Sequence, residues 1–213
     1  LYQGEWLRVM RAKLGLDAAD SRPAAVERRP GTDDDARLVD DLFAAMSGQG
    51  VDFTRFFRAL GTVMREGSAA APQLGALFDR PDALDGWLQR WSERVGAGGD
   101  GAAECADAMD RVNPLYVPRN HLVEAALQAA EAHGELGPVE TLLDVLRAPC
   151  EARPGFEGFE EPAPDDFVVS TGVTRRTTSV ASFRPKAAWV SQVIRWVTPV
   201  VEEARPFGVP LSS

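Results

Sequence analysis

Apolar side chains recur at helical spacing along about the first 148 residues, and this periodicity is the strongest constraint on the fold. Residues three and four positions apart share one face of an α-helix, so such a stripe predicts a helix with one buried side. The segment "EWLRVMRAKLGL" shows it with Trp6, Leu7, Met10 and Leu14. We therefore predict a mainly α fold for this part of the chain.

Further helices follow from the same spacing and from capping residues. Asp52 is expected to cap the helix that begins with Phe53, because a carboxylate at this position accepts from free N–H groups. Residues 17–32 are polar, contain proline and predict a linker. The expected helices cover residues 32–48, 53–64, 80–95, 102–111, 118–133 and 137–148.

The acids of "TDDD" at residues 32–35 allow two interpretations. Carboxylates are favourable at a helix N-terminus, where they face the positive end of the helix dipole. They are also typical metal ligands. We interpret these acids as a solvated helix start and expect no metal site here.

The composition changes after residue 148. Residues 149–166 are acidic and rich in proline, which predicts an extended coil. Residues 167–213 carry six basic residues against two glutamates, in a chain whose net charge is -9. Within this tail, "VVSTGVTRRTTSVASF" predicts a strand pair, and "KAAWVSQVIRWVTPVVEEA" predicts a helix kinked at Pro199 or two shorter helices. We divide the chain into a helical segment (1–148), a coil (149–166) and a tail of unknown role (167–213).

Charge and composition exclude several classes of protein. The acidic balance argues against binding to nucleic acid or to an anionic membrane. A membrane-spanning helix needs about 18 consecutive apolar residues, and the sequence has no such run. Cys105 and Cys150 form neither a disulfide framework nor a zinc site, which fits a reducing compartment and predicts a cytoplasmic protein. The chain starts without methionine and in mid-pattern, so we expect it to be a piece of a longer protein.

The run "GAGGDG" at residues 96–101 matches the G-x-G-x-x-G pattern by letter. A dinucleotide-binding turn needs a strand before these glycines. Here an amphipathic helical pattern precedes them, so we interpret the run as a flexible connector. His121 and His133 have no partner at metal-ligand spacing. The pattern therefore supplies no catalytic, cofactor-binding or metal-binding residue.

The segment "VNPLYVPRNHLVEAALQAAEAHG" is the most structured run in the chain. Asn113 before Pro114 predicts an extended backbone, and Pro118 is expected in the first helical turn. Arg119 and Asn120 are predicted to be structural anchors rather than catalysts. We expect the helix to be buried along Leu122, Ala126 and Ala129.

Three ordered segments resemble the selenoprotein O (SelO) family over about residues 6–160. "WLRVMRAKLGL" is similar to the family pattern W-x-x-x-M-R-x-K-L-G-L, and "LVDDLFAAMSGQGVDFTRFFRAL" contains its D-[FY]-T-x-x-F-R-x-L. "MDRVNPLYVPRNHLVEAALQAAEAHGELGPVETLLDVLRAPCEARPGFEGF" resembles its C-terminal part, with the pairs N-P and R-N and then L-L-x-x-L-R-x-P. The tail after Asp166 departs from the family, and Leu211 stands where a C-S-S ending places its cysteine.

The resemblance implies a kinase-like fold and transfer of AMP from ATP, with Mg²⁺, to hydroxyl side chains of protein substrates. The family's catalytic and nucleotide-binding motifs lie upstream of the matched region, so no catalytic residue is carried over and this chain alone is expected to be inactive. Its expected partner is the N-terminal kinase-like part of the same protein. The alternatives are a stand-alone helical protein-interaction module and a small enzyme that uses the arginines and acids of residues 111–121.

Overall fold

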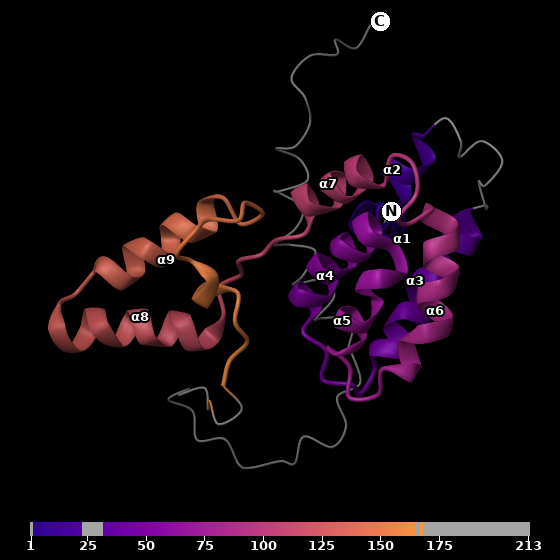
Figure 1. Ribbon diagram of the computed structural model, residues 1–213. Coiled ribbons are helices and arrows are strands. Elements are labelled where there is room, and N and C mark those ends of the chain that lie inside the picture. Colours follow the sequence, from indigo (N-terminus) through magenta and orange to yellow (C-terminus); the bar gives the residue numbers. More distant parts are fainter. Residues whose placement is uncertain (1, 23–31, 165–166, 168–213) are drawn as a thin grey trace, which may run out of the picture.

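The computed structural model describes residues 2–22, 32–164 and 167, and it confirms a mainly α fold (Figure 1). No strand occurs among these residues. The α-helices are α1 (Tyr2–Lys13), α2 (Leu16–Asp20), α3 (Thr32–Met46), α4 (Phe53–Glu66), α5 (Ala71–Gly75), α6 (Asp82–Val95), α7 (Ala102–Val112), α8 (Asn120–His133) and α9 (Gly137–Arg147). Two short 3₁₀ turns, η2 (Gly67–Ala70) and η3 (Glu157–Phe159), complete the described elements.

Helices α1 to α7 form a bundle around one hydrophobic core (Figure 1). The predicted stripes of α4 and α6 lie inside it, and Phe56, Leu60 and Trp91 are fully buried. The indole N–H of each buried tryptophan of α6 also has a hydrogen-bond acceptor. The indole N–H of Trp87 donates to the Leu38 carbonyl at 2.7 Å, and that of Trp91 donates to the Leu14 carbonyl at 3.0 Å. These two bonds join α6 to α3 and to the end of α1.

The predicted linker at residues 17–32 is wrong at its start, because α2 occupies Leu16–Asp20. Gly15 has φ +72°, which turns the chain after α1 and lets Leu16 enter the core. A side chain at Gly15 would place its Cβ 2.7 Å from the Met109 sulfur, so this turn requires glycine. The acids of α2 pair with Arg11, which explains a helix in a polar stretch.

Helices α8 and α9 form an antiparallel hairpin beside the bundle (Figure 1). The chain reaches the hairpin from α7 through an extended segment in which Asn113 has φ -105° and ψ 105°, as predicted before Pro114. Residues 148–164 then return along the base of the hairpin as turns, bends and one 3₁₀ turn. The predicted strands and helix of the tail lie outside the described residues.

Candidate functional site

A buried polar network lies where α7 ends and the chain leaves the bundle. The Asn113 side chain is 0% exposed and donates to the Lys13 carbonyl at 2.9 Å. The Lys13 ammonium, also buried, donates to Asn113 Oδ1 at 3.1 Å and lies 5.2 Å from the centre of the Phe57 ring. Two bonds in opposite directions therefore lock the end of α1 to the end of α7.

Burial lowers the pKa of Lys13 from its ordinary 10.5 to about 8, because its desolvated ammonium has no carboxylate among these contacts. The folded state therefore binds the proton of Lys13 more weakly than the unfolded state does. Between the folded and unfolded pKa values the unfolded chain binds more protons, so this residue's contribution to stability rises with pH. Burial of the charged Lys13 lowers the free energy of unfolding by its full amount below about pH 8, and this loss disappears as the pH approaches 10.5.

We expect Lys13→Met to remove this pH dependence. Relative to the variant, the parent should gain about 2 kcal/mol in free energy of unfolding between pH 7 and pH 10, as the linkage relation gives for this pKa shift. Urea unfolding of both proteins at each pH measures the difference. Both proteins carry Cys150→Ser, because the charge of Lys13 acts on the pKa of the Cys150 thiol, whereas the Cys105 thiol titrates in both and cancels. A constant difference across this range would contradict a buried, charged Lys13.

Two arginines hold the hairpin and its following coil against the bundle. Arg58 of α4 donates to the carbonyl oxygens of Asp110 at 2.9 Å and Asn113 at 3.0 Å, where the chain leaves α7. It also reaches the Cys150 carbonyl of the coil at 3.5 Å. Arg119, at the N-cap of α8, pairs with Asp52 at 2.7 Å and donates to the Glu160 carbonyl at 2.8 Å. Arg119 therefore links α8, the start of α4 and the coil, which is the anchoring geometry predicted for it.

The neighbouring predictions fare differently. Asn120 is exposed in this chain, so its anchoring role stays a prediction, and Asn113 supplies the buried amide contacts here. Pro118 precedes the N-cap and lies outside the first turn. Asp52 does cap α4, as predicted, by accepting from the Arg55 N–H at 3.0 Å. His121 is half-buried, and its ring lies 5.8 Å from that of Phe167.

The two asparagines provide a matched test. Asn113→Ala should lower the free energy of unfolding by about 1–3 kcal/mol, because it removes the donor to the buried Lys13 carbonyl and leaves the Lys13 ammonium with only the longer contact to the Val112 carbonyl. Asn120→Ala should change it by less than about 0.5 kcal/mol, as exposed substitutions do. Urea titration followed by circular dichroism measures both. Equal losses would show that Asn120 has an anchoring role after all.

A cluster of buried charges joins four helices. Its centre is the pair Arg94 and Asp35, whose side chains are 7% and 1% exposed and whose guanidinium and carboxylate groups meet at 3.1 Å. Arg94 also contacts Asp20 at 2.9 Å, and Arg11 contacts both Asp20 and Asp35. Burial raises the pKa of Asp20, but hydrogen bonds from Arg94 and Arg11 outweigh it and the net shift is downward.

The interpretation of "TDDD" as a wholly solvated helix start is therefore wrong for Asp35. Asp33 and Asp34 are exposed, whereas Asp35 faces the core. The sequence contained the signal, because Asp35 precedes Leu38 and Leu42 by three and seven positions and shares their helical face. A charge on an apolar stripe indicates a buried partner, but the pattern alone does not say which arginine supplies it.

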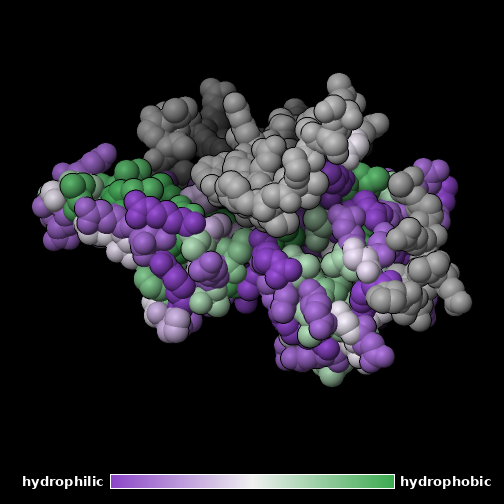
Figure 2. All heavy atoms as spheres, turned by 90° about the horizontal axis from the view of Figure 1, so that it is seen from above, coloured by the Kyte–Doolittle hydropathy of each residue, from purple (hydrophilic) through white to green (hydrophobic). Residues whose placement is uncertain are grey.

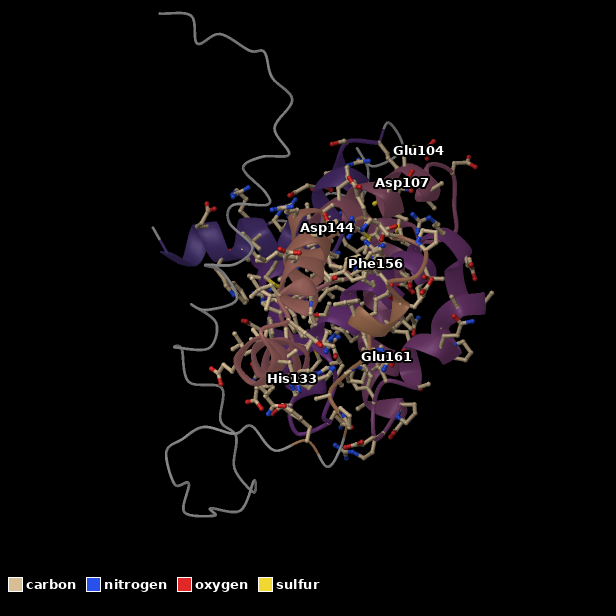
Figure 3. The ribbon with its side chains drawn as sticks, turned by 90° about the vertical axis from the view of Figure 1, so that its left-hand side faces the viewer. Glu104, Asp107, His133, Asp144, Phe156 and Glu161 are labelled. Carbon is tan, nitrogen blue, oxygen red and sulfur yellow. The ribbon has the colours of Figure 1, made fainter. Side chains whose placement is uncertain are left out.

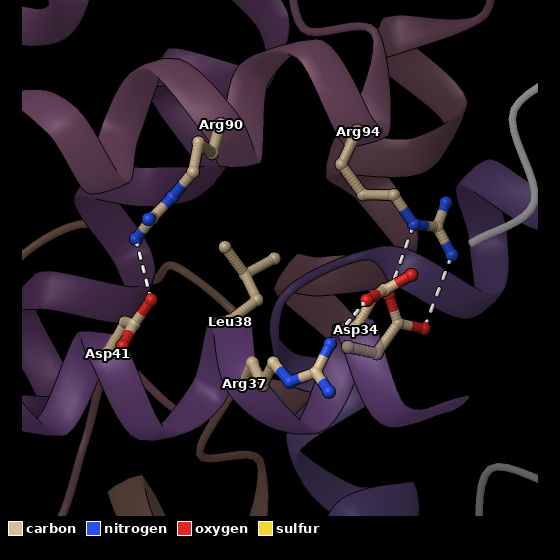
Figure 4. Close-up of a pocket in the computed structure, with 7 residues that line it drawn as sticks. Asp34, Arg37, Leu38, Asp41, Arg90 and Arg94 are labelled. Atoms are coloured by element: carbon tan, nitrogen blue, oxygen red, sulfur yellow. Dashed lines mark hydrogen bonds and ion pairs between the residues drawn. The ribbon is translucent and has the colours of Figure 1, made fainter. Parts of the chain in front are cut away.

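A hollow of about 290 Å³ lies next to this cluster, between α3 and α6 (Figure 4). The charged side chains that line it form ion pairs. Arg90 pairs with Asp41 at 2.8 Å, and Arg37 pairs with Asp34 at 3.0 Å. The lining residues are Asp34, Asp35, Arg37, Leu38, Asp41, Arg90 and Arg94. Three acids balance three arginines, so the hollow offers neither an anion nor a cation an uncompensated charge.

The glycine run forms the predicted connection between α6 and α7, and internal hydrogen bonds hold its backbone. Four successive N–H groups, those of residues 96–99, donate to carbonyl oxygens of the protein itself. Gly98 donates to the Met64 carbonyl at 2.8 Å. A Cβ at Gly98 would meet the Cα of Gly67 at 3.0 Å, so close backbone contact requires glycine here. These N–H groups are not available to a phosphate.

The remaining candidates show no feature of a reactive centre. Cys105 and Cys150 are both free thiols, and burial raises the pKa of each, which disfavours the nucleophilic thiolate. Within the described ranges, no three metal-ligating side chains come together. None of the helices there is both long and apolar enough to cross a bilayer. In Figure 3, His133 at the end of α8 lies well below Glu104 and Asp107 of α7.

Comparison with known proteins gives the family. The family model for protein adenylyltransferase SelO matches residues 1–147. The protein nucleotidyltransferase YdiU of Sphingopyxis alaskensis is 45% identical over 165 residues, which cover 78% of this chain and 31% of the relative. That of Mycolicibacterium paratuberculosis is 46% identical over 168 residues, covering 78% of this chain and 30% of the relative. This chain thus spans less than a third of the length of these relatives, and it belongs to the family of protein adenylyltransferase SelO.

Proposed function

We propose that this chain is the helical C-terminal part of a SelO-type protein nucleotidyltransferase with a kinase-like fold. In the proposed reaction, a hydroxyl oxygen of a protein substrate bonds to the α-phosphorus of ATP, pyrophosphate leaves, and the hydroxyl proton passes to a base. The observation that carries the proposal is the family match over residues 1–147, in a chain that spans 31% of its Sphingopyxis alaskensis relative.

The polar side chains of this chain support a structural part in that enzyme. Lys13 is buried against Asn113, and Arg58 and Arg119 are occupied by carbonyl and carboxylate oxygens. The glycine run uses its N–H groups internally. These residues do not fit ATP or its Mg²⁺ ion, so we assign the nucleotide and catalytic groups to other residues of the longer polypeptide. The two free cysteines are compatible with a reducing cytoplasm, where we propose that the protein works.

The test compares this chain with the full-length Sphingopyxis alaskensis relative. Both are incubated with Mg²⁺, protein substrates and ATP labelled at the α-phosphate, and label transferred to protein is counted. We expect transfer by the relative alone. Calorimetric titration of this chain with ATP and Mg²⁺ should also show no binding in the micromolar range. Tight, magnesium-dependent binding would place a nucleotide site in this chain and refute its structural role.

A stand-alone interaction module is the second candidate, and the exposed leucines Leu127, Leu136 and Leu143 favour it. The two candidates differ in their requirement for the rest of the polypeptide. A module should bind its partner protein at full affinity as the isolated chain. A part of a nucleotidyltransferase should support AMP transfer only within the full-length enzyme.

A further inference from the structure

The hairpin of α8 and α9 exposes the large apolar side chains of this molecule. Leu127, Leu136 and Leu143 are 51%, 59% and 53% exposed, and they are the large hydrophobic residues found exposed in the described part of the chain. We call them the hairpin leucines. Figure 2 shows apolar surface over the hairpin, at the left of the view. Apolar surface gathered on one element is typical of a contact site.

The hairpin buries little of its own apolar surface. Helix α8 buries only Ala126, and α9 buries Leu142 and Val145. Helix α4, which has the same length as α8, buries six residues in the bundle. Along α8, Ala125, Ala129 and Ala132 line a shallow, open hollow together with the polar Gln128, Glu131 and His133. The hairpin therefore has the surface of a helix pair that packs on another element.

The polar contacts at its base fix the hairpin before any such packing. Arg119 binds Asp52 and the Glu160 carbonyl, and the N–H groups of Leu115 and Tyr116 donate to the Pro149 carbonyl at 2.7 and 3.1 Å. The Tyr116 hydroxyl accepts from the Arg153 N–H at 3.0 Å. A surface that is already oriented loses less conformational entropy on docking.

The family match indicates what covers this surface. Residues 1–147 are common to the family, and they include both helices of the hairpin, whereas the tail lies beyond the family model. The helices that carry this surface thus lie inside the segment that matches the family, and an occupant can be sought in the rest of the family polypeptide. The relatives provide one, because this chain accounts for only 31% and 30% of two of them.

We propose that the hairpin leucines dock against the part of the full-length SelO-type polypeptide that lies outside this chain. The inference rests on the proposed function, in that this chain acts as part of a longer enzyme. It assigns the intramolecular contact to α8 and α9, and it leaves the bundle of α1 to α7 as a unit with a core of its own.

Cysteine labelling tests this assignment. Leu127→Cys and Leu143→Cys are made in the 213-residue chain and in a full-length chimera, in which residues 1–147 of this chain replace the aligned segment of the Sphingopyxis alaskensis relative. Gln89→Cys, an exposed position on α6, is the matched control. Each protein reacts with a maleimide, and peptide mapping separates the new sites from the other cysteines of each protein.

We expect both leucine positions to react at least about tenfold more slowly in the chimera than in the 213-residue chain, with Gln89→Cys unchanged. Equal rates in the two proteins would overturn the proposal. Slow labelling already in the 213-residue chain would also overturn it. Dependence on protein concentration would then identify a second copy as the occupant, and relief on deleting residues 168–213 would identify the tail. Because labelling needs no catalysis, a chimera that is protected but transfers no AMP would refute the proposed reaction and leave this contact standing.

Discussion

Asp35→Ala is expected to lower the free energy of unfolding by about 3–5 kcal/mol, the usual cost of breaking a buried ion pair by removing one partner. The carboxylate is 1% exposed and contacts both Arg94 and Arg11. Its removal leaves the Arg94 guanidinium, 7% exposed, in the protein interior with Asp20 as its remaining acid. The loss of stability should affect α1, α2, α3 and α6 together, because each of these helices contributes a charge to the cluster. Urea unfolding followed by circular dichroism measures it.

The exposed pair Asp41 and Arg90 provides the matched control, since it also joins α3 to α6. Its side chains are 51% and 57% exposed and meet at 2.8 Å. Solvent screens such a pair, so Asp41→Ala should cost about 0.2–1 kcal/mol. Similar losses for Asp35→Ala and Asp41→Ala would show that burial of the Asp35 cluster adds nothing to the free energy of unfolding.

Trp91→Ala is expected to cost about 3–5 kcal/mol, as deletion of a large buried aromatic side chain does. Trp91 is fully buried, its ring lies 6.0 Å from that of Trp87, and its N–H satisfies the Leu14 carbonyl. The substitution leaves a cavity and an unpaired carbonyl at the turn between α1 and α2. Circular dichroism at increasing urea concentration is the measurement, because tryptophan fluorescence changes with the substitution itself.

Two further variants of α6 interpret that result. Trp91→Phe keeps much of the ring volume but loses the N–H donor, so it should cost less than Trp91→Ala. Gln89→Ala changes an exposed position of the same helix and should stay within about 0.5 kcal/mol of the parent. A Trp91→Ala protein as stable as the Gln89→Ala protein would mean that the core does not depend on this ring.

Periodicity was enough to predict the longer helices, because each stripe specifies a buried face without reference to its partner, whereas the five-residue helices α2 and α5 are too short to show a stripe. The face of α6 that carries Trp87 and Trp91 is buried as its spacing predicts. What spacing does not give is the identity of the element that covers a face. Leu142 and Leu143 are adjacent and chemically identical, yet they are 9% and 53% exposed. For the same reason, Leu122 and Ala129 are only half-buried where full burial was predicted.

Polar roles were harder to predict than helices. The local sequence around "PRN" correctly indicated Arg119 as an anchor, because a planar group with five donors suits a helix start that faces other chain segments. It did not distinguish Asn113 from Asn120, since their difference depends on Lys13, which lies a hundred residues away in the chain. Long-range pairing of this kind is a property of the folded molecule and leaves no local pattern.

The two carboxylate oxygens of Asp52 accept different hydrogen bonds, so a replacement with a single acceptor oxygen loses one of them. Oδ1 accepts from the Arg55 N–H at the start of α4, and Oδ2 accepts from the Arg119 guanidinium at the start of α8. An asparagine has the same shape but only one acceptor oxygen. It would keep either the cap or the anchor and would turn an NH₂ group toward a donor at the other. At this position, isosteric replacement is therefore not chemical equivalence, and the starts of two distant helices depend on one negative charge.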